Sequence, residues 1–221
     1  MGNCAVITTR EREIGVYLHW NGGCDTVEPL LKYCELQGYR SPSSDGYGWA
    51  RMCQVMGNYF GGSLSLGIGD YTTDKRMNPG DNGIYVIEGW KIVDRIYAYG
   101  DPYEQQVYDF DDMLREFDNA MPERLRLGEF LDSVEVPADE VRLGDEVWLF
   151  GVGGTWEAYP VVGFGQPKTN RIAVWIDAPD GRREVTYPDR PYAARYDHDG
   201  DFSWNSNNYV HGDTARIKPR V

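Results

Sequence analysis

A strand, a glycine turn and a helix follow one another without a linker in residues 13–25, which read EIGVYLHWNGGCD. Strand alternation places every second residue on the same face of a sheet. One face carries Ile14, Val16, Leu18 and Trp20, and the other carries Tyr17 and His19. The Asn-Gly-Gly sequence permits a sharp turn, because glycine adopts backbone conformations that other residues avoid. The segment therefore predicts a buried strand that ends at a polar, titratable His19.

His19 is the first candidate site residue. An imidazole at the end of a strand can act as a general base or activate a nucleophile, and the Cys24 thiol lies nearby in the sequence. The sequence does not identify the third member of such a triad. A histidine that bonds a neighbouring backbone carbonyl is the alternative interpretation. We take His19 as the candidate catalytic residue. The adjoining turn supplies the candidate binding residues Trp20, Asn21, Gly22 and Gly23.

Residues 1–128 predict a mixed α/β domain. Its expected elements are strands at 4–9, 14–20, 63–68, 83–88 and 90–99, and helices after the glycine turn, across 49–60 and after Asp109. The helices are expected because apolar residues repeat with helical spacing. The first helix is expected to begin near Asp25 or Thr26, since both residue types commonly cap helices. Pro29 fits only a first helical turn and favours the later cap, Thr26.

From residue 129 to 221 the pattern changes to short strands separated by turns. The expected strands lie at 145–150, 158–164, 172–177 and 183–187, with a further strand near 213–218. Strands of this length and spacing are typical of a small SH3-like β-barrel. The chain as a whole is therefore expected to be an α+β protein, with a mixed α/β N-terminal domain followed by a small SH3-like β-barrel.

The net charge of −13 bears on the partners of the chain. An acidic surface repels nucleic-acid backbones and anionic membranes, which argues against direct binding to DNA or RNA. Solubility explains such a charge without any function, and the alternative is an acidic surface that imitates a polyanion. Tyrosines near carboxylates can contact a basic protein partner, or they can be a half-exposed sheet edge. The tyrosines in question are Tyr97, Tyr99 and Tyr103.

One acidic turn raises the question of a metal. Asp197, Asp199 and Asp201 alternate as the first ligands of a calcium loop do, because a hard cation needs several oxygens on a short arc. The EF-hand pattern fails, since the glycine follows the second acid and Asn208 occupies the twelfth position. A solvated acidic turn is the simpler interpretation, and calcium is the alternative. No other cofactor is expected, because the sequence lacks the phosphate-loop, dinucleotide, metalloprotease and nucleophile-elbow motifs.

The N-terminus does not predict a targeting segment. No basic region followed by an apolar core precedes the first strand, and no apolar run reaches transmembrane length. We therefore expect a cytoplasmic protein without membrane contact, and the oligomeric state remains open. The cysteines are expected to be reduced thiols in that compartment. Cys34 and Cys53 fall on the apolar stripes of expected helices, where a thiol behaves as a small hydrophobic group.

The first 70 or so residues resemble an uncharacterised protein family of bacteria and their phages or integrative elements. The resemblance rests on the VYLHWxGG motif at residues 16–23 and on the helix opening Thr26-Val27-Glu28. It also rests on Gly2-Asn3, on Ala5–Thr8 and on Trp49-Ala50-Arg51. Cys4 and Cys24 depart from it, because more polar residues are expected at those two positions. The resemblance implies a mobile-element or phage setting and does not imply a reaction.

Taken together, these features favour a non-enzymatic binding or interaction protein with a protein partner. A narrower version is an acidic inhibitor of a host protein that handles nucleic acid. The first alternative is a hydrolase or transferase that uses His19 beside the Gly22-Gly23 turn. The second alternative is a divalent-metal protein that uses the three alternating aspartates.

Overall fold

The protein is described by a computed structural model that is mixed α and β and contains two sheets. The described residues are 3–61, 66–70, 79–96, 107–150, 154–165, 171–188 and 214–220. The chain divides into two compact units, an N-terminal unit of Met1–Arg126 and a C-terminal unit of Leu127–Val221. The sequence places the change of pattern between residues 128 and 129.

A five-stranded sheet forms the centre of the N-terminal unit, in the order β3-β2-β1-β4-β5. The strands are β1 (Ala5–Thr9), β2 (Ile14–Leu18), β3 (Leu66–Asp70), β4 (Ile84–Glu88) and β5 (Lys91–Ile96). β1 runs parallel to β4, and the other neighbouring pairs are antiparallel. The expected hairpins β1–β2 and β4–β5 are confirmed, whereas β3 begins three residues later than the strand expected at 63–68.

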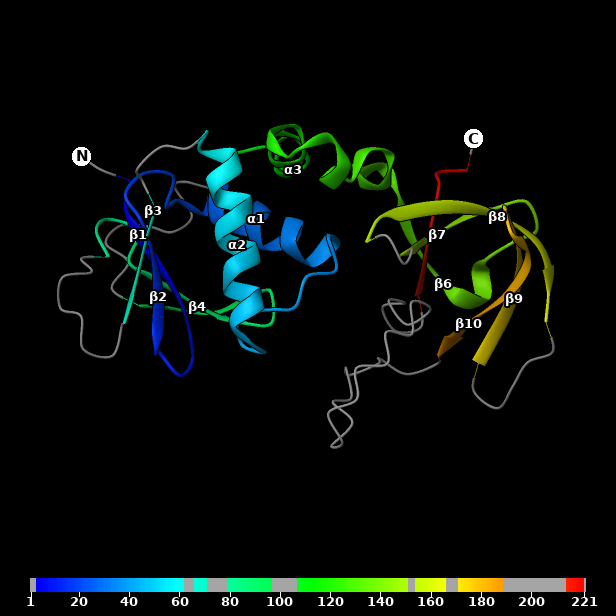
Figure 1. The fold of residues 1–221 in the computed structure, drawn as a ribbon, viewed down its shortest axis with the longest axis horizontal. Coiled ribbons are helices and arrows are strands. Elements are labelled where there is room, and N and C mark those ends of the chain that lie inside the picture. The colour runs from blue at the N-terminus through cyan, green and yellow to red at the C-terminus, as the bar shows by residue number, and fades with distance from the viewer. Residues whose placement is uncertain are drawn as a thin grey trace. The chain divides into compact units, whose positions relative to one another are not determined.

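Alternation along the strands gives this sheet two different faces. Helices α1 (Cys24–Leu36) and α2 (Gly46–Tyr59) lie on one side of the sheet in Figure 1. Tyr85 on β4 belongs to that side, because its hydroxyl reaches the first residue of α1. The opposite face carries a smaller apolar cluster of Val6, Ile84 and Val86, against which Tyr17 and Ile96 pack. Tyr17 therefore lies on the side turned away from the helices.

The helices are set by their apolar stripes and, in two cases, by an aspartate cap. Asp45 accepts hydrogen bonds from two backbone N–H groups at the start of α2, and Asp109 does so once for α3 (Phe110–Ala120). The expected start of α1 is wrong. Its N-cap is Gly23, without a side-chain cap, and Pro29 lies inside the helix. Burial of residues such as Leu30 and Leu31 outweighs the backbone hydrogen bond that proline removes.

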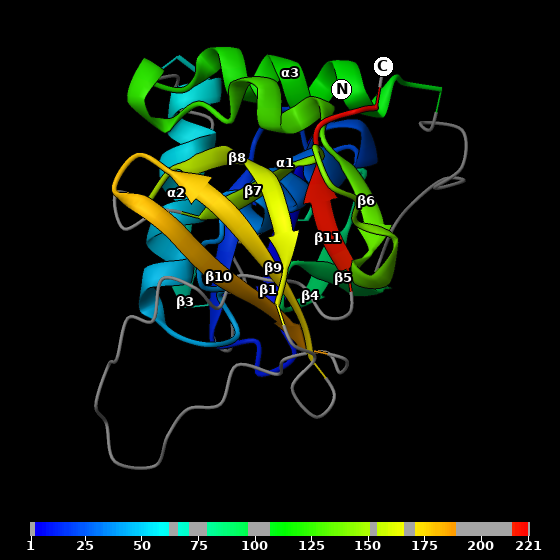
Figure 2. The ribbon, with the colours of Figure 1, turned by 90° about the vertical axis from the view of Figure 1, so that its right-hand side faces the viewer.

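The C-terminal unit contains a six-stranded antiparallel sheet in the order β10-β9-β8-β7-β11-β6. Its strands are β6 (Val134–Pro137), β7 (Glu146–Phe150), β8 (Trp156–Phe164), β9 (Arg171–Ala178), β10 (Gly181–Pro188) and β11 (Thr214–Ile217). Figure 2 shows β11, drawn in red, between β7 and β6. The core of this unit consists mainly of small and β-branched side chains, among them Val147, Val161, Val174, Ile176 and Ile217.

Five of these six strands match the expected ones to within two residues at either end, and β6 is an addition. The sequence does not predict β6, because the strand is only four residues long and none of its residues is fully buried. Within the described residues no hydrogen-bonded ladder joins β10 to β6. The coarse α+β class is therefore confirmed, and closure of this sheet into a barrel stays a prediction. No described helix is long and apolar enough to span a membrane.

Candidate functional site

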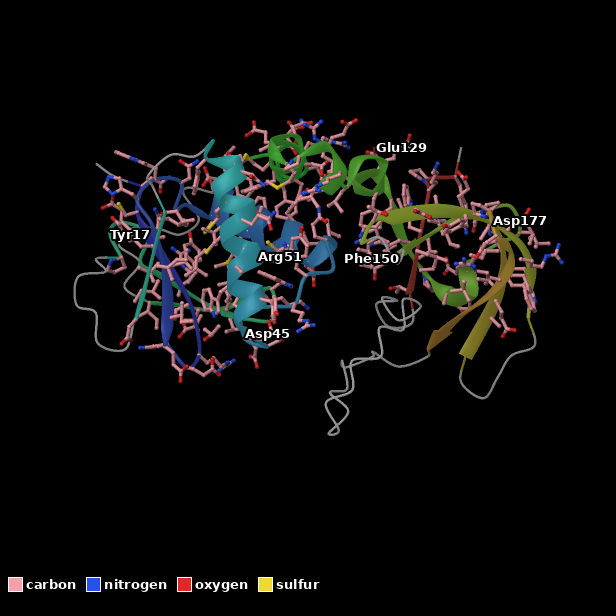
Figure 3. All side chains as sticks on the ribbon, in the orientation of Figure 1. Tyr17, Asp45, Arg51, Glu129, Phe150 and Asp177 are labelled. Carbon is pink, nitrogen blue, oxygen red and sulfur yellow. The ribbon has the colours of Figure 1, made fainter. Side chains whose placement is uncertain are left out.

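The register of the β1–β2 hairpin brings Cys4 opposite His19. Ala5 pairs with Leu18 in this ladder, so the residues one step beyond each strand are neighbours across it. The next pair on the same face of the sheet is Val6 with Tyr17. Cys4, Tyr17 and His19 therefore gather at one corner of the sheet, on the side away from α1 and α2. Figure 3 labels Tyr17 at this corner.

Three polar groups meet at this corner. The Tyr17 hydroxyl lies 3.3 Å from the Cys4 sulfur and 3.1 Å from Nδ1 of His19. The direct separation of the sulfur and Nδ1 is longer, 3.9 Å. The thiol also donates a hydrogen bond to the His19 carbonyl oxygen at 3.0 Å. The phenol therefore bridges the thiol and the imidazole, and we call these three residues the Cys4 cluster.

The exposure and protonation of the Cys4 cluster suit chemistry with a molecule from solution. His19 is exposed, while Cys4 and Tyr17 are half-buried. The hydrogen bond to Cys4, helped by partial burial, raises the pKa of Tyr17 to about 12. The phenol therefore keeps its proton at neutral pH and remains a donor to the sulfur or to the ring nitrogen. The cluster combines a nucleophile, a proton donor and an accessible base.

The turn after β2 presents Trp20 next to the cluster. The indole and the His19 imidazole meet edge to face, with ring centroids 4.7 Å apart and planes at 81°. Asn21 adopts a left-handed conformation with φ of 60°. Gly22 packs so closely on β1 that a Cβ there would lie 2.7 Å from the Ala5 backbone nitrogen. Gly23 precedes α1, and its carbonyl accepts the first hydrogen bonds of that helix. Gly22 thus has a structural reason, which is its close contact with β1.

Asn82 holds the backbone of Cys4 in place. Because β1 and β4 are parallel, Asn82 lies beside Cys4 just before the two strands begin. Its backbone N–H and its side-chain amide both donate to the Cys4 carbonyl, at 3.1 and 3.2 Å. The same amide donates to the side chain of Asn3. Arg95 holds Asn82 in turn, since Nη2 donates to its carbonyl oxygen at 2.5 Å. Asn82 is only 3% exposed.

The sequence suggested Cys24 as the thiol near His19, and the structure places that thiol elsewhere. Cys24 is buried at the start of α1, on the helix-covered side of the sheet. Its sulfur lies 3.5 Å from the Tyr85 hydroxyl and accepts from Arg95 at 3.1 Å. The sequence did not point to Cys4 as a site residue, although the register of the expected hairpin places it opposite His19. Thr9 and Ile14 flank the predicted turn, and five residues before Thr9 is Cys4 while five residues after Ile14 is His19.

The other expected site residues lie outside the described residues. They are the tyrosines Tyr97, Tyr99 and Tyr103 and the aspartates Asp197, Asp199 and Asp201. Among the described residues no three His, Cys, Asp or Glu side chains gather closely enough to hold a metal ion. The four cysteines are free thiols, and Cys34 is buried in the core as expected.

The chain was compared with protein-family models, with curated proteins and with solved structures. No family model, curated protein or solved structure matches it. Its function must therefore be argued from the geometry of the Cys4 cluster.

Proposed function

We propose that the protein is a thiol-dependent acyl-transfer enzyme, of the hydrolase or transferase class, with Cys4 as nucleophile and His19 as base. The observation that carries this proposal is the convergence of the Cys4 sulfur, the Tyr17 hydroxyl and His19 Nδ1 over 3.1 to 3.9 Å at an accessible corner of the sheet. A thiol beside an accessible base is the arrangement that nucleophilic catalysis requires. Hydrogen bonds of this kind are often long in a protein without substrate and shorten when it binds.

The shortest route for the thiol proton passes through the phenol. In the structure the phenol donates to the sulfur and the thiol donates to the His19 carbonyl, so both protons first turn, the thiol proton toward the Tyr17 oxygen and the phenol proton toward Nδ1 of His19. The Cys4 proton then moves to the Tyr17 oxygen while the Tyr17 proton moves to Nδ1, which leaves a thiolate and an imidazolium. The thiolate attacks the carbonyl carbon of the substrate. The tetrahedral adduct then expels the leaving group, which takes a proton back from the imidazolium by the same route. The acyl group remains on Cys4 as a thioester, and water or another nucleophile removes it.

The test follows acylation with p-nitrophenyl acetate as the probe. The intact protein should release one equivalent of p-nitrophenolate in a burst and gain one acetyl group on Cys4 by mass spectrometry. Cys4→Ala should abolish the burst, and His19→Gln and Tyr17→Phe should slow it by roughly 100-fold or more, the usual worth of a general base. Cys53→Ser is the matched control, because Cys53 is also half-buried and lies outside the cluster.

Two outcomes would overturn the proposal. The first is an acetylated Cys4 whose rate is the same in wild type and His19→Gln. The second is a burst that Cys4→Ala leaves intact. Circular dichroism on each variant shows whether the fold is retained, so that loss of the burst is not confused with unfolding.

A second candidate is an interaction protein of a phage or mobile element, acting in the cytoplasm on a host protein that handles nucleic acid. Its support is the net charge of −13 together with exposed acids on α3, namely Asp111, Asp112 and Glu116. Such a surface can occupy a basic groove. Capture of host proteins from a nuclease-treated lysate should retain a basic partner. That partner should be lost when the three acids are replaced by Asn and Gln, and retention by the triple variant argues against this candidate.

Two narrower proposals concern the C-terminal unit. Closure of its sheet into an SH3-like barrel agrees with the short antiparallel strands, and an experimental structure of residues 127–221 in the full chain tests it.

Calcium binding by Asp197, Asp199 and Asp201 is tested by the melting temperature. A rise at millimolar calcium that Asp199→Asn removes supports the proposal, and an unchanged melting temperature refutes it.

A further inference from the structure

The side chain that borders the Cys4 cluster on its exposed side is Trp20. It is 49% exposed and lies two residues beyond the end of β2, whose last residue, Leu18, is fully buried. One part of the indole contacts the His19 ring, and about half of the side chain remains open to solvent. An exposed tryptophan side chain is unfavourable in free energy, because its large apolar area stays in water until a ligand covers it.

The turn that carries Trp20 is fixed on both sides. The Gly22 N–H donates to the Asn3 carbonyl at 2.8 Å, and the Tyr85 hydroxyl donates to the Gly22 carbonyl at 2.9 Å. Asn21 contributes a turn conformation that few residues adopt. The backbone under Trp20 is therefore ordered before any ligand arrives, and a ring that stacks there loses little affinity to ordering the protein.

The described contacts of the Cys4 cluster favour recognition by an aromatic ring over recognition by an ion pair. Within the described residues its hydrogen bonds and ring contacts join its own members, the His19 carbonyl and Trp20, and no Asp, Glu, Lys or Arg side chain takes part. The net charge of −13 disfavours ligands that carry several phosphates. An indole that already meets the His19 ring and stays half exposed suits a flat ring, since aromatic pairs gain energy beyond the area they bury.

We infer that Trp20 determines specificity, and that the substrate carries an uncharged aromatic ring next to the carbon that Cys4 attacks. The ring stacks on the open face of the indole, while the reacting carbon lies over the sulfur on the other side of His19. This inference rests on the proposed function for its reaction, but the recognition step can be measured without acyl transfer.

The experiment uses two alkylating probes of equal size, N-benzyl chloroacetamide and N-(cyclohexylmethyl) chloroacetamide. Both place their ring three atoms away from the carbon that reacts with a thiol, and only the first ring is flat. The rate of labelling of Cys4 is measured by mass spectrometry in the intact protein and divided by the rate for free cysteine. An aromatic pair contributes about 1 kcal/mol, so the benzyl probe should react roughly fivefold faster.

The variants separate recognition from reactivity. Trp20→Ala and Trp20→Leu should bring the ratio of the two rates to about one, and Trp20→Phe should keep part of the preference. The rate with unsubstituted chloroacetamide is measured in each variant and divides out any change in the reactivity of the thiol, because Trp20 also contacts His19. Tyr47→Ala is the matched control, because Tyr47 is an aromatic residue on α2 that is 69% exposed and lies outside the site.

A wild-type ratio near one, or a preference that Trp20→Ala retains, overturns the inference. Its failure is distinguishable from that of the proposed function. If the ester burst occurs without an aromatic preference, the enzyme proposal stands and the substrate class is wrong. If the preference is present but no ester acylates Cys4, the aromatic site stands and the reaction is wrong.

Discussion

Replacement of Gly22 by alanine tests how the turn is held against β1. The added Cβ would lie 2.7 Å from three atoms, which are the Ala5 Cβ, the Ala5 nitrogen and the Cys4 carbonyl carbon. Ordinary contacts between such atoms are about 3.5 Å or more, so the turn must move by several tenths of an ångström. Two of the three atoms belong to backbone and Ala5 is fully buried, so β1 cannot give way easily.

The loss of stability expected for Gly22→Ala has two contributions. Overpacking in a well-packed region typically costs about 1 to 3 kcal/mol. A turn that moves away from β1 also weakens the hydrogen bonds of Gly22 with Asn3 and Tyr85, each worth about 1 kcal/mol. We therefore expect Gly22→Ala to lower the free energy of unfolding by about 3 kcal/mol. This corresponds to a fall in the melting temperature on the order of 10 °C for a unit of this size.

The assay is urea denaturation and thermal melting, with Gly57→Ala as the matched control. Gly57 lies inside α2, and a Cβ there would meet nothing within 4 Å. Alanine should stabilise that position by about 0.5 to 1 kcal/mol, because it has the higher helix propensity. The two variants add the same methyl group with opposite expected signs. Equal stability of the two would refute the argument that Gly22 is required by its contact with β1.

Three other outcomes follow from the hydrogen bonds. Hydrogen bonding to Cys4 raises the pKa of Tyr17, and burial raises the pKa of three further tyrosines, so the folded N-terminal unit binds phenolic protons more tightly than the unfolded chain. Its stability should be intact below pH 10 and fall between pH 10 and 12, with phenolate absorbance at 295 nm appearing together with unfolding; the tyrosines are Tyr17, Tyr33, Tyr85 and Tyr108. In the C-terminal unit, Arg220 donates two hydrogen bonds to Asp145 and lowers its pKa. Arg220→Ala should therefore lower the stability at pH 7 in urea denaturation, and the difference from wild type should shrink as the pH falls below about 4. The exposed pair of Arg183 with Asp180 is the control, and Arg183→Ala should lower the stability less than Arg220→Ala does. Finally, Asn82→Ala should slow iodoacetamide labelling of Cys4 several-fold without changing its dependence on pH, because Asn82 positions the thiol and does not titrate; an unchanged rate in a folded variant would contradict that role.

The elements of the fold were largely predictable because their signals are local. The helical repeat of α1 is Val27, Leu30, Leu31 and Cys34, and Asp45 and Asp109 stand where the caps of α2 and α3 are needed. Local signals failed where a tertiary contact outweighed them. Pro29 is accommodated inside α1 because the helix buries an apolar face, and the helix starts directly after the turn in which Gly22 packs against β1.

The candidate site was half predictable. His19 and Trp20 stand out in the sequence because a titratable residue and a large aromatic one follow a buried strand directly. The nucleophile does not stand out, because nearness along the chain favoured Cys24 over Cys4. Strand pairing reverses that order, since it joins residues 15 positions apart and leaves Cys24 on the opposite face of the sheet.

The sequence alone therefore determined the secondary structure, the two-part organisation and the importance of the strand–turn–helix segment. Periodicity, caps and glycines act over a few residues, so a single sequence contains them in full. The tertiary structure decided which thiol meets His19, that Tyr17 bridges the two, and that Asn82, just before β4 and 78 residues further along the chain, holds Cys4. Such contacts depend on register and on parallel pairing across the sheet, and these are set only when the whole unit packs.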